Sequence, residues 1–166
     1  MHDFGTTPEQ LAQVAVTFRD HAVRNPRSVM GRKGAITIAD VLASRMIADP
    51  LHLLDCCIDN DGGYAFVMTS TERARDLRRP TIAVLGAATG LWTATYDDPA
   101  DGYYGSPAVE TGAKAFGQAQ VGHADLDVLG LYDCFTITIL RLLEDLGFCE
   151  LGAGGELVAS GEIGLG

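Results

Sequence analysis

The stretch "LYDCFTITILRLLEDLGF", residues 131–148, contains the two patterns that decide the fold class. Its first residue ends the segment 126–131, which is predicted to be a strand. Apolar side chains then recur at helical spacing, which predicts a helix over 135–146 that ends at Gly147. A strand followed at once by an amphipathic helix indicates a protein in which helices cover a sheet.

Two more segments have the composition of strands that are buried on both faces, namely 64–69 and 81–86. Further helices are predicted from Thr7-Pro8 to Asn25, from Thr37 to Arg45, over 71–77 and from Ser106 to Gln120, with 49–63 as a loop. Strands that alternate with helices predict an α/β protein with a parallel or mixed sheet. Because three strands make a thin sheet, we expect only part of a larger α/β fold.

Three side chains that can do chemistry lie at the turn between the predicted strand and helix. Asp133 is of a type that caps helices, and we expect it to cap the helix that follows. Cys134 is expected to be a small core residue. For Tyr132 two interpretations remain: a buried tyrosine whose hydroxyl finds a backbone partner, or a catalytic group.

Composition excludes several classes of protein. The net charge of −10 argues against a nucleic-acid surface, which needs a basic stripe. No apolar run approaches the roughly 20 residues of a membrane span, and the N-terminus does not have the pattern of a secretory signal. The four cysteines have no zinc spacing, so we expect free thiols, no metal site and a cytoplasmic protein.

Three stretches resemble the thiolase superfamily, in its sterol-carrier-protein-type, lipid-transfer branch. They are "GTTPEQLAQVA" (5–15), "ADPLHLLDCCIDNDGGYAFVM" (48–68) and "LYDCFTITILRLLEDLGFC" (131–149). The resemblance implies an α/β thiolase-like fold, layered helix-sheet-helix-sheet-helix, of which the chain holds a partial copy. Residues 1–80 would be the loop region and last strand of the first half, and 81–166 the start of the second half. The nucleophilic cysteine would lie before residue 1, so the chain alone is expected to be inactive.

The same resemblance implies roles for individual residues. Tyr132 falls where the family places a histidine or asparagine that helps to build an oxyanion hole, and Phe135 where a phenylalanine lines the pantetheine tunnel. A tyrosine at this position is similar to the steroid side-chain aldolases, in which tyrosines serve retro-aldol cleavage of a β-hydroxyacyl-CoA. Phe4 corresponds to a residue at the tunnel mouth. Cys57 falls where a family serine hydrogen-bonds the pantetheine amide.

We therefore expect part of a thiolase-like enzyme that acts on acyl-CoA thioesters in lipid or steroid metabolism. The reaction would be acyl transfer (thiolysis) or retro-aldol cleavage, with the coenzyme A thioester as substrate and no cofactor. The alternatives are a non-catalytic module that binds acyl-CoA or lipid or acts as a scaffold, and a piece that does not fold alone. The intact protein is expected to be a homodimer with an OB-fold partner protein. Trp92 and Tyr103-Tyr104 would belong to a lid or a subunit contact.

Overall fold

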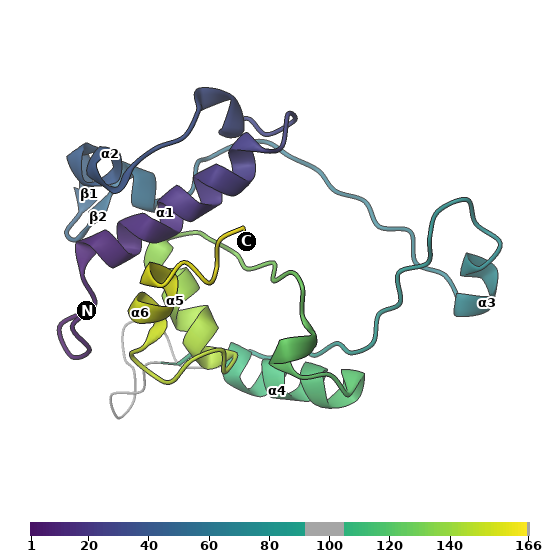
Figure 1. Cartoon of the computed structure of the whole chain (residues 1–166). Coiled ribbons are helices and arrows are strands. Elements are labelled where there is room, and N and C mark those ends of the chain that lie inside the picture. The colour runs from purple at the N-terminus through teal and green to yellow at the C-terminus, as the bar shows by residue number, and fades with distance from the viewer. Residues whose placement is uncertain (92–104, 166) are drawn as a thin grey trace.

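The computed structural model describes residues 1–91 and 105–165, so the predicted lid around Trp92 and Tyr103-Tyr104 lies outside the described residues. Helices, including short 3₁₀ turns (η), make up most of its regular structure (Figure 1). The elements in chain order are α1 (Pro8–Val23), η1 (Gly31–Lys33), α2 (Ile38–Ala43), β1 (Met46–Ala48), β2 (Leu51–His52), η2 (Leu53–Asp55), α3 (Thr71–Ala74), α4 (Ala108–Ala119), η4 (His123–Asp125), α5 (Thr136–Asp145) and α6 (Gly154–Ala159).

The first two α-helices begin with capping boxes, as their sequences predict. The Thr7 hydroxyl accepts a hydrogen bond from the Gln10 backbone at 3.3 Å, and the Gln10 side chain accepts one from the Thr7 backbone at 2.9 Å. Thr37 and Asp40 repeat this exchange at the start of α2, at 3.2 and 2.8 Å. Each pair satisfies backbone donors that the first helical turn leaves without a partner, so four side chains fix where both helices begin.

The predicted stop of the last long helix is also confirmed. Gly147 follows α5 with a φ of 81°, in the left-handed region that favours glycine. Its N–H donates to the Glu144 carbonyl, and the Phe148 N–H donates to the Leu143 carbonyl, both at 2.9 Å. These two bonds are those of a Schellman motif, and they turn the chain back towards α6.

The hydrophobic core lies where α1 packs against α5 and α6. Figure 1 shows α1 (purple) crossing beside the α5–α6 pair (light green and yellow). The core residues are apolar side chains at most 3% exposed: Leu11, Val14, Ile139, Leu140, Leu143 and Val158. Burial of each large aliphatic side chain contributes about 1.5–3 kcal/mol, so this three-helix contact is the main source of stability in the described residues.

The three segments predicted as buried strands are not strands in the structure, and this part of the prediction was wrong. Residues 64–69, 81–86 and 126–131 have no strand assignment; within the described residues the one sheet is the β1–β2 hairpin. Tyr64 is 94% exposed and Ile82 is 91% exposed. A strand needs a neighbour that pairs with its backbone groups, and the described part of the chain places none beside these segments.

The region around residues 49–63, predicted as loop, contains local structure at its start. β1 and β2 form a short antiparallel hairpin, which η2 follows directly. Beyond η2 the chain leaves the helical body, carries α3 at its far end and returns to α4 (Figure 1). None of the helices described is long and apolar enough to cross a membrane.

Candidate functional site

The candidate site lies where the segment after η2 meets the turn before α5. Cys56 and Phe135 form an isolated antiparallel bridge, and the Cys57 N–H donates to the Cys134 carbonyl at 3.0 Å. The structure therefore places Cys57 beside the turn that carries Tyr132, although the two lie far apart in the sequence.

Asp55 holds these two segments together from inside the protein. It is 4% exposed, and its Oδ1 accepts a hydrogen bond from the Thr136 hydroxyl at 2.9 Å. Its Oδ2 accepts one from the His52 backbone at 2.8 Å. The Asp55–Thr136 bond joins the last residue of η2 to the first residue of α5. Asp55 was not predicted as a site residue from the sequence. An acid three residues after His52 signals a local cap, but it does not reveal a partner 81 residues away.

Replacing Asp55 with alanine is expected to lower the free energy of unfolding by about 1–3 kcal/mol. The change removes both hydrogen bonds and leaves the buried Thr136 hydroxyl without its acceptor. Urea unfolding followed by circular dichroism measures the effect. The matched control is Asp59→Ala, an exposed aspartate nearby, which should shift stability by less than about 0.5 kcal/mol. Equal midpoints for Asp55→Ala and the parent chain would show that Asp55 is not the anchor.

Tyr132 is exposed in the structure rather than buried at the end of a strand. Its side chain is 71% exposed. The negative charge of the neighbouring Cys57 thiolate, and then that of Cys134, raises the pKa of Tyr132 above its ordinary value of 10.0. A hydrogen bond to the Cys57 side chain acts in the same direction. The phenol therefore keeps its proton at neutral pH and can donate it or a hydrogen bond.

The prediction that Asp133 caps the following helix was wrong. The N-cap of α5 is Phe135, and no side chain makes a capping hydrogen bond there. The bridge to Cys56 and the Asp55–Thr136 bond position the start of this helix instead. Asp133 thus remains at the turn next to Tyr132, and its charge adds the smallest contribution to the raised pKa of that residue.

The four residues singled out from the sequence do not all come together. Cys57 and Tyr132 are neighbours, and Phe135, 42% exposed, lies on the same turn. Phe4 packs against Gly152, in the loop between α5 and α6, where its ring occupies the space that a side chain at 152 would need. The structure thus supports one cluster of three residues and leaves the role of Phe4 at a tunnel mouth as a prediction.

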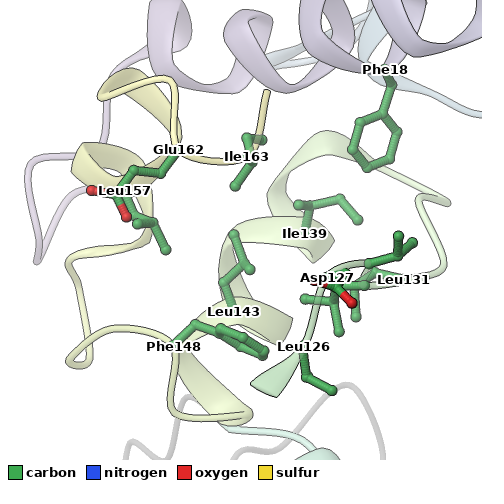
Figure 2. A pocket seen from close by; sticks show the side chains of 12 residues that line it. Phe18, Leu126, Asp127, Leu131, Ile139, Leu143, Phe148, Leu157, Glu162 and Ile163 are labelled. Atoms are coloured by element: carbon green, nitrogen blue, oxygen red, sulfur yellow. The ribbon is translucent and has the colours of Figure 1, made fainter. Parts of the chain in front are cut away.

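A separate apolar cavity of about 260 Å³ lies among α1, α5, α6 and residues 126–131 (Figure 2). Phe18, Ile139, Leu143 and Leu157 project towards it from the three helices in Figure 2. Its acidic lining residues are Asp127 and Glu162, and its lining includes none of the three clustered residues. In the described residues, no group of three or more metal-ligating side chains is found.

Comparison with known proteins shows what this chain is similar to. Residues 86–166 match the family described as thiolase C-terminal domain-like. The chain is 40% identical over its full length to a steroid side-chain-cleaving aldolase of Thermomonospora curvata, of which it covers 43%. It is 35% identical, over 97% of its length, to an acetyl-CoA acetyltransferase of Methanothermobacter thermautotrophicus, of which it covers 42%. The solved Ltp2-ChsH2(DUF35) aldolase superposes on 97% of the chain with a TM-score of 0.89 and 39% identity, and 43% of that chain is covered.

Residues 86–166 are similar to a thiolase C-terminal-like domain, and the fold of the chain is a partial copy of the α/β thiolase-like fold. The resemblance found in the sequence is thereby confirmed. The chain spans less than half of the length of the relatives named above. The division at residue 80, and the roles of Phe4, Cys57, Tyr132 and Phe135, stay predictions.

Proposed function

We propose that this chain is part of a thiolase-like enzyme of lipid or steroid metabolism that cleaves a carbon–carbon bond of a β-hydroxyacyl-CoA by a retro-aldol reaction. The observation that carries the proposal is Tyr132, an exposed phenol that keeps its proton at neutral pH beside the Cys57 thiol. Similarity over the whole chain to a protein named as a steroid side-chain-cleaving aldolase supports the same reaction.

The proposed reaction assigns Tyr132 the role of a donor. A base removes the proton of the β-hydroxyl, the bond between the α and β carbons breaks, and its electron pair moves onto the thioester oxygen as an enolate. The Tyr132 hydroxyl donates a hydrogen bond or a proton as this charge develops. Its raised pKa makes it a poor base at neutral pH, so the initial proton abstraction falls to another group.

The same proposal places the pantetheine arm of the substrate along Cys57 and Phe135. Cys57 is exposed and offers a weak thiol donor to an amide, while the half-exposed Phe135 ring offers an apolar contact. The Phe4 ring packs at Gly152 and not in this cluster. The proposal therefore assigns Phe4 a contact at the mouth of the pantetheine tunnel and none with the arm beside Cys57 and Phe135. The substrate is the coenzyme A thioester itself, and the reaction as written needs no further cofactor.

The proposal extends to partners of the complete enzyme. The solved aldolase that this chain resembles is named as an assembly of Ltp2 with ChsH2(DUF35). We infer from this name that the complete enzyme also binds a second protein, for which the OB-fold stays a prediction. The homodimer expected from the resemblance is likewise part of the proposal.

Dependence on free coenzyme A tests the reaction type. In the complete enzyme that carries this segment, a β-hydroxyacyl-CoA should be cleaved to a ketone or aldehyde and a shortened acyl-CoA without added coenzyme A. Retro-aldol cleavage uses no second thiol, whereas thiolysis consumes one molecule of coenzyme A for each bond broken. Liquid chromatography measures both the acyl-CoA products and the consumption of free coenzyme A. Cleavage of a β-ketoacyl-CoA only, and only with coenzyme A present, would favour acyl transfer instead.

The cavity in Figure 2 gives less support to the alternative of a non-catalytic acyl-CoA-binding module. Its charged lining residues are the acids Asp127 and Glu162, which would repel the phosphates of coenzyme A. The enzyme proposal therefore accounts for more of the described features.

A further inference from the structure

Cys57 and Cys134 occupy opposite positions on two antiparallel segments. Cys56 and Phe135 are bridge partners, so the next pair along the two segments is Cys57 with Cys134. The hydrogen bond from the Cys57 N–H to the Cys134 carbonyl, 3.0 Å long, fixes this register. Side chains of directly opposed residues project from the same face of an antiparallel pair. The two thiols therefore lie on one face, away from Cys56.

Directly opposed residues of antiparallel segments have the Cα spacing that a disulfide needs. The Cα atoms of directly opposed residues lie about 4.5–5.5 Å apart in antiparallel pairs, and disulfides span about 4.4–6.8 Å. Both cysteines are free thiols; Cys57 is exposed and Cys134 is half-buried. The Cys134 sulfur now lies 3.4 Å from the Thr138 hydroxyl, and it can move to other staggered positions by rotation about its Cα–Cβ bond.

We propose that Cys57 and Cys134 form a reversible cross-strand disulfide when the protein meets a disulfide oxidant such as oxidised glutathione. The Cys57 thiolate attacks one sulfur of the oxidant and releases one glutathione thiolate. The Cys134 thiolate then attacks the Cys57 sulfur of this mixed disulfide and releases the second. The two protein thiols lose two electrons and two protons in total, and the oxidant becomes two molecules of glutathione.

The environments of the other two cysteines favour selectivity for this pair. Burial, followed by the charge of Asp55, raises the pKa of the Cys56 thiol. Burial, followed by the charges of Glu144 and Glu150, raises the pKa of the Cys149 thiol. A raised pKa lowers the fraction of reactive thiolate near neutral pH, so both thiols should react slowly.

The disulfide would also act on Tyr132. It would remove the Cys57 thiol that now hydrogen-bonds the phenol and the thiolate charges that raise its pKa. It would tie the segment after η2 to the turn before α5 covalently. The chemistry of the two thiols does not rest on the proposed function, so it can be tested on this chain by itself.

The experiment is titration of the folded chain with oxidised glutathione near pH 8, with intact mass spectrometry and a thiol count. The expected result is the loss of two of the four free thiols and of the mass of two hydrogens, reversed by dithiothreitol. Because Cys56 and Cys57 are adjacent, single serine variants assign the bond. Cys57→Ser and Cys134→Ser should abolish it, whereas Cys56→Ser and Cys149→Ser should leave it intact.

Oxidation in urea is the control for geometry. Unfolded chain should give a mixture of pairings, since only the folded register opposes Cys57 to Cys134. The proposal is overturned if the folded chain accumulates only stable glutathione adducts, or if Cys56→Ser abolishes the bond and Cys57→Ser does not. The same mixture of pairings in folded and unfolded chain would overturn it as well.

Discussion

Tyr132→Phe is expected to lower the rate of retro-aldol cleavage in the complete enzyme by roughly 10²–10³-fold, about 3–4 kcal/mol of transition-state stabilisation. The substitution keeps the ring and removes only the hydroxyl that would donate to the developing enolate. Because this donor acts mainly in the transition state, kcat should fall while substrate affinity changes little. Steady-state kinetics with a β-hydroxyacyl-CoA measure both quantities.

A matched tyrosine controls for unspecific effects of removing a phenol. Tyr64 is 94% exposed on the segment that leaves the helical body, and Tyr64→Phe should leave kcat unchanged. Thermal melting shows whether a loss of activity comes from a loss of stability. Because the Tyr132 side chain is exposed, Tyr132→Phe should hardly alter the melting temperature. If Tyr132→Phe cleaves the substrate at the parent rate, the catalytic role assigned to this residue is wrong.

Leu11→Ala is expected to lower the free energy of unfolding of this chain by about 2–5 kcal/mol. Leu11 is 1% exposed on α1, inside the contact with α5 and α6, and truncation leaves a cavity that the three helices can close only in part. Since small domains are stabilised by only about 5–15 kcal/mol, the loss is a large fraction of the total. Urea unfolding measures the change.

Leu77→Ala makes the same chemical change outside this core. Leu77 is 54% exposed and lies just beyond α3, so its truncation should alter the unfolding free energy by less than about 0.5 kcal/mol. Equal effects of the two substitutions would mean that the contact of α1 with α5 and α6 does not dominate the stability.

Features set by neighbouring residues could be predicted from the sequence. The pairs Thr7–Gln10 and Thr37–Asp40 lie three residues apart, and Gly147 follows its own helix, so each of these features depends only on local chain geometry. The site depends on more distant partners. Asp55 and Thr136 are 81 residues apart, and no local pattern in the sequence joins them.

The strand predictions were wrong for the same reason: strand formation depends on partners that are distant in the sequence. Both 64–69 and 81–86 are apolar enough for buried strands, but pairing is a property of two segments at once, and in the structure both segments are exposed and have no strand assignment. Asp133 was misassigned because the start of α5 is positioned by contacts from η2 and the bridge rather than by the nearest capping side chain.

We expect the exposed segment around Tyr64 to affect how the isolated chain behaves in solution. Between Asp61 and Glu72 it carries no charge, and Tyr64, Phe66, Val67 and Met68 are each at least 81% exposed. Short uncharged windows of this kind template cross-β self-association when nothing pairs with their backbone. Two copies can meet along such a window at a rate that rises with the square of protein concentration. Dilution should therefore keep the isolated chain monodisperse.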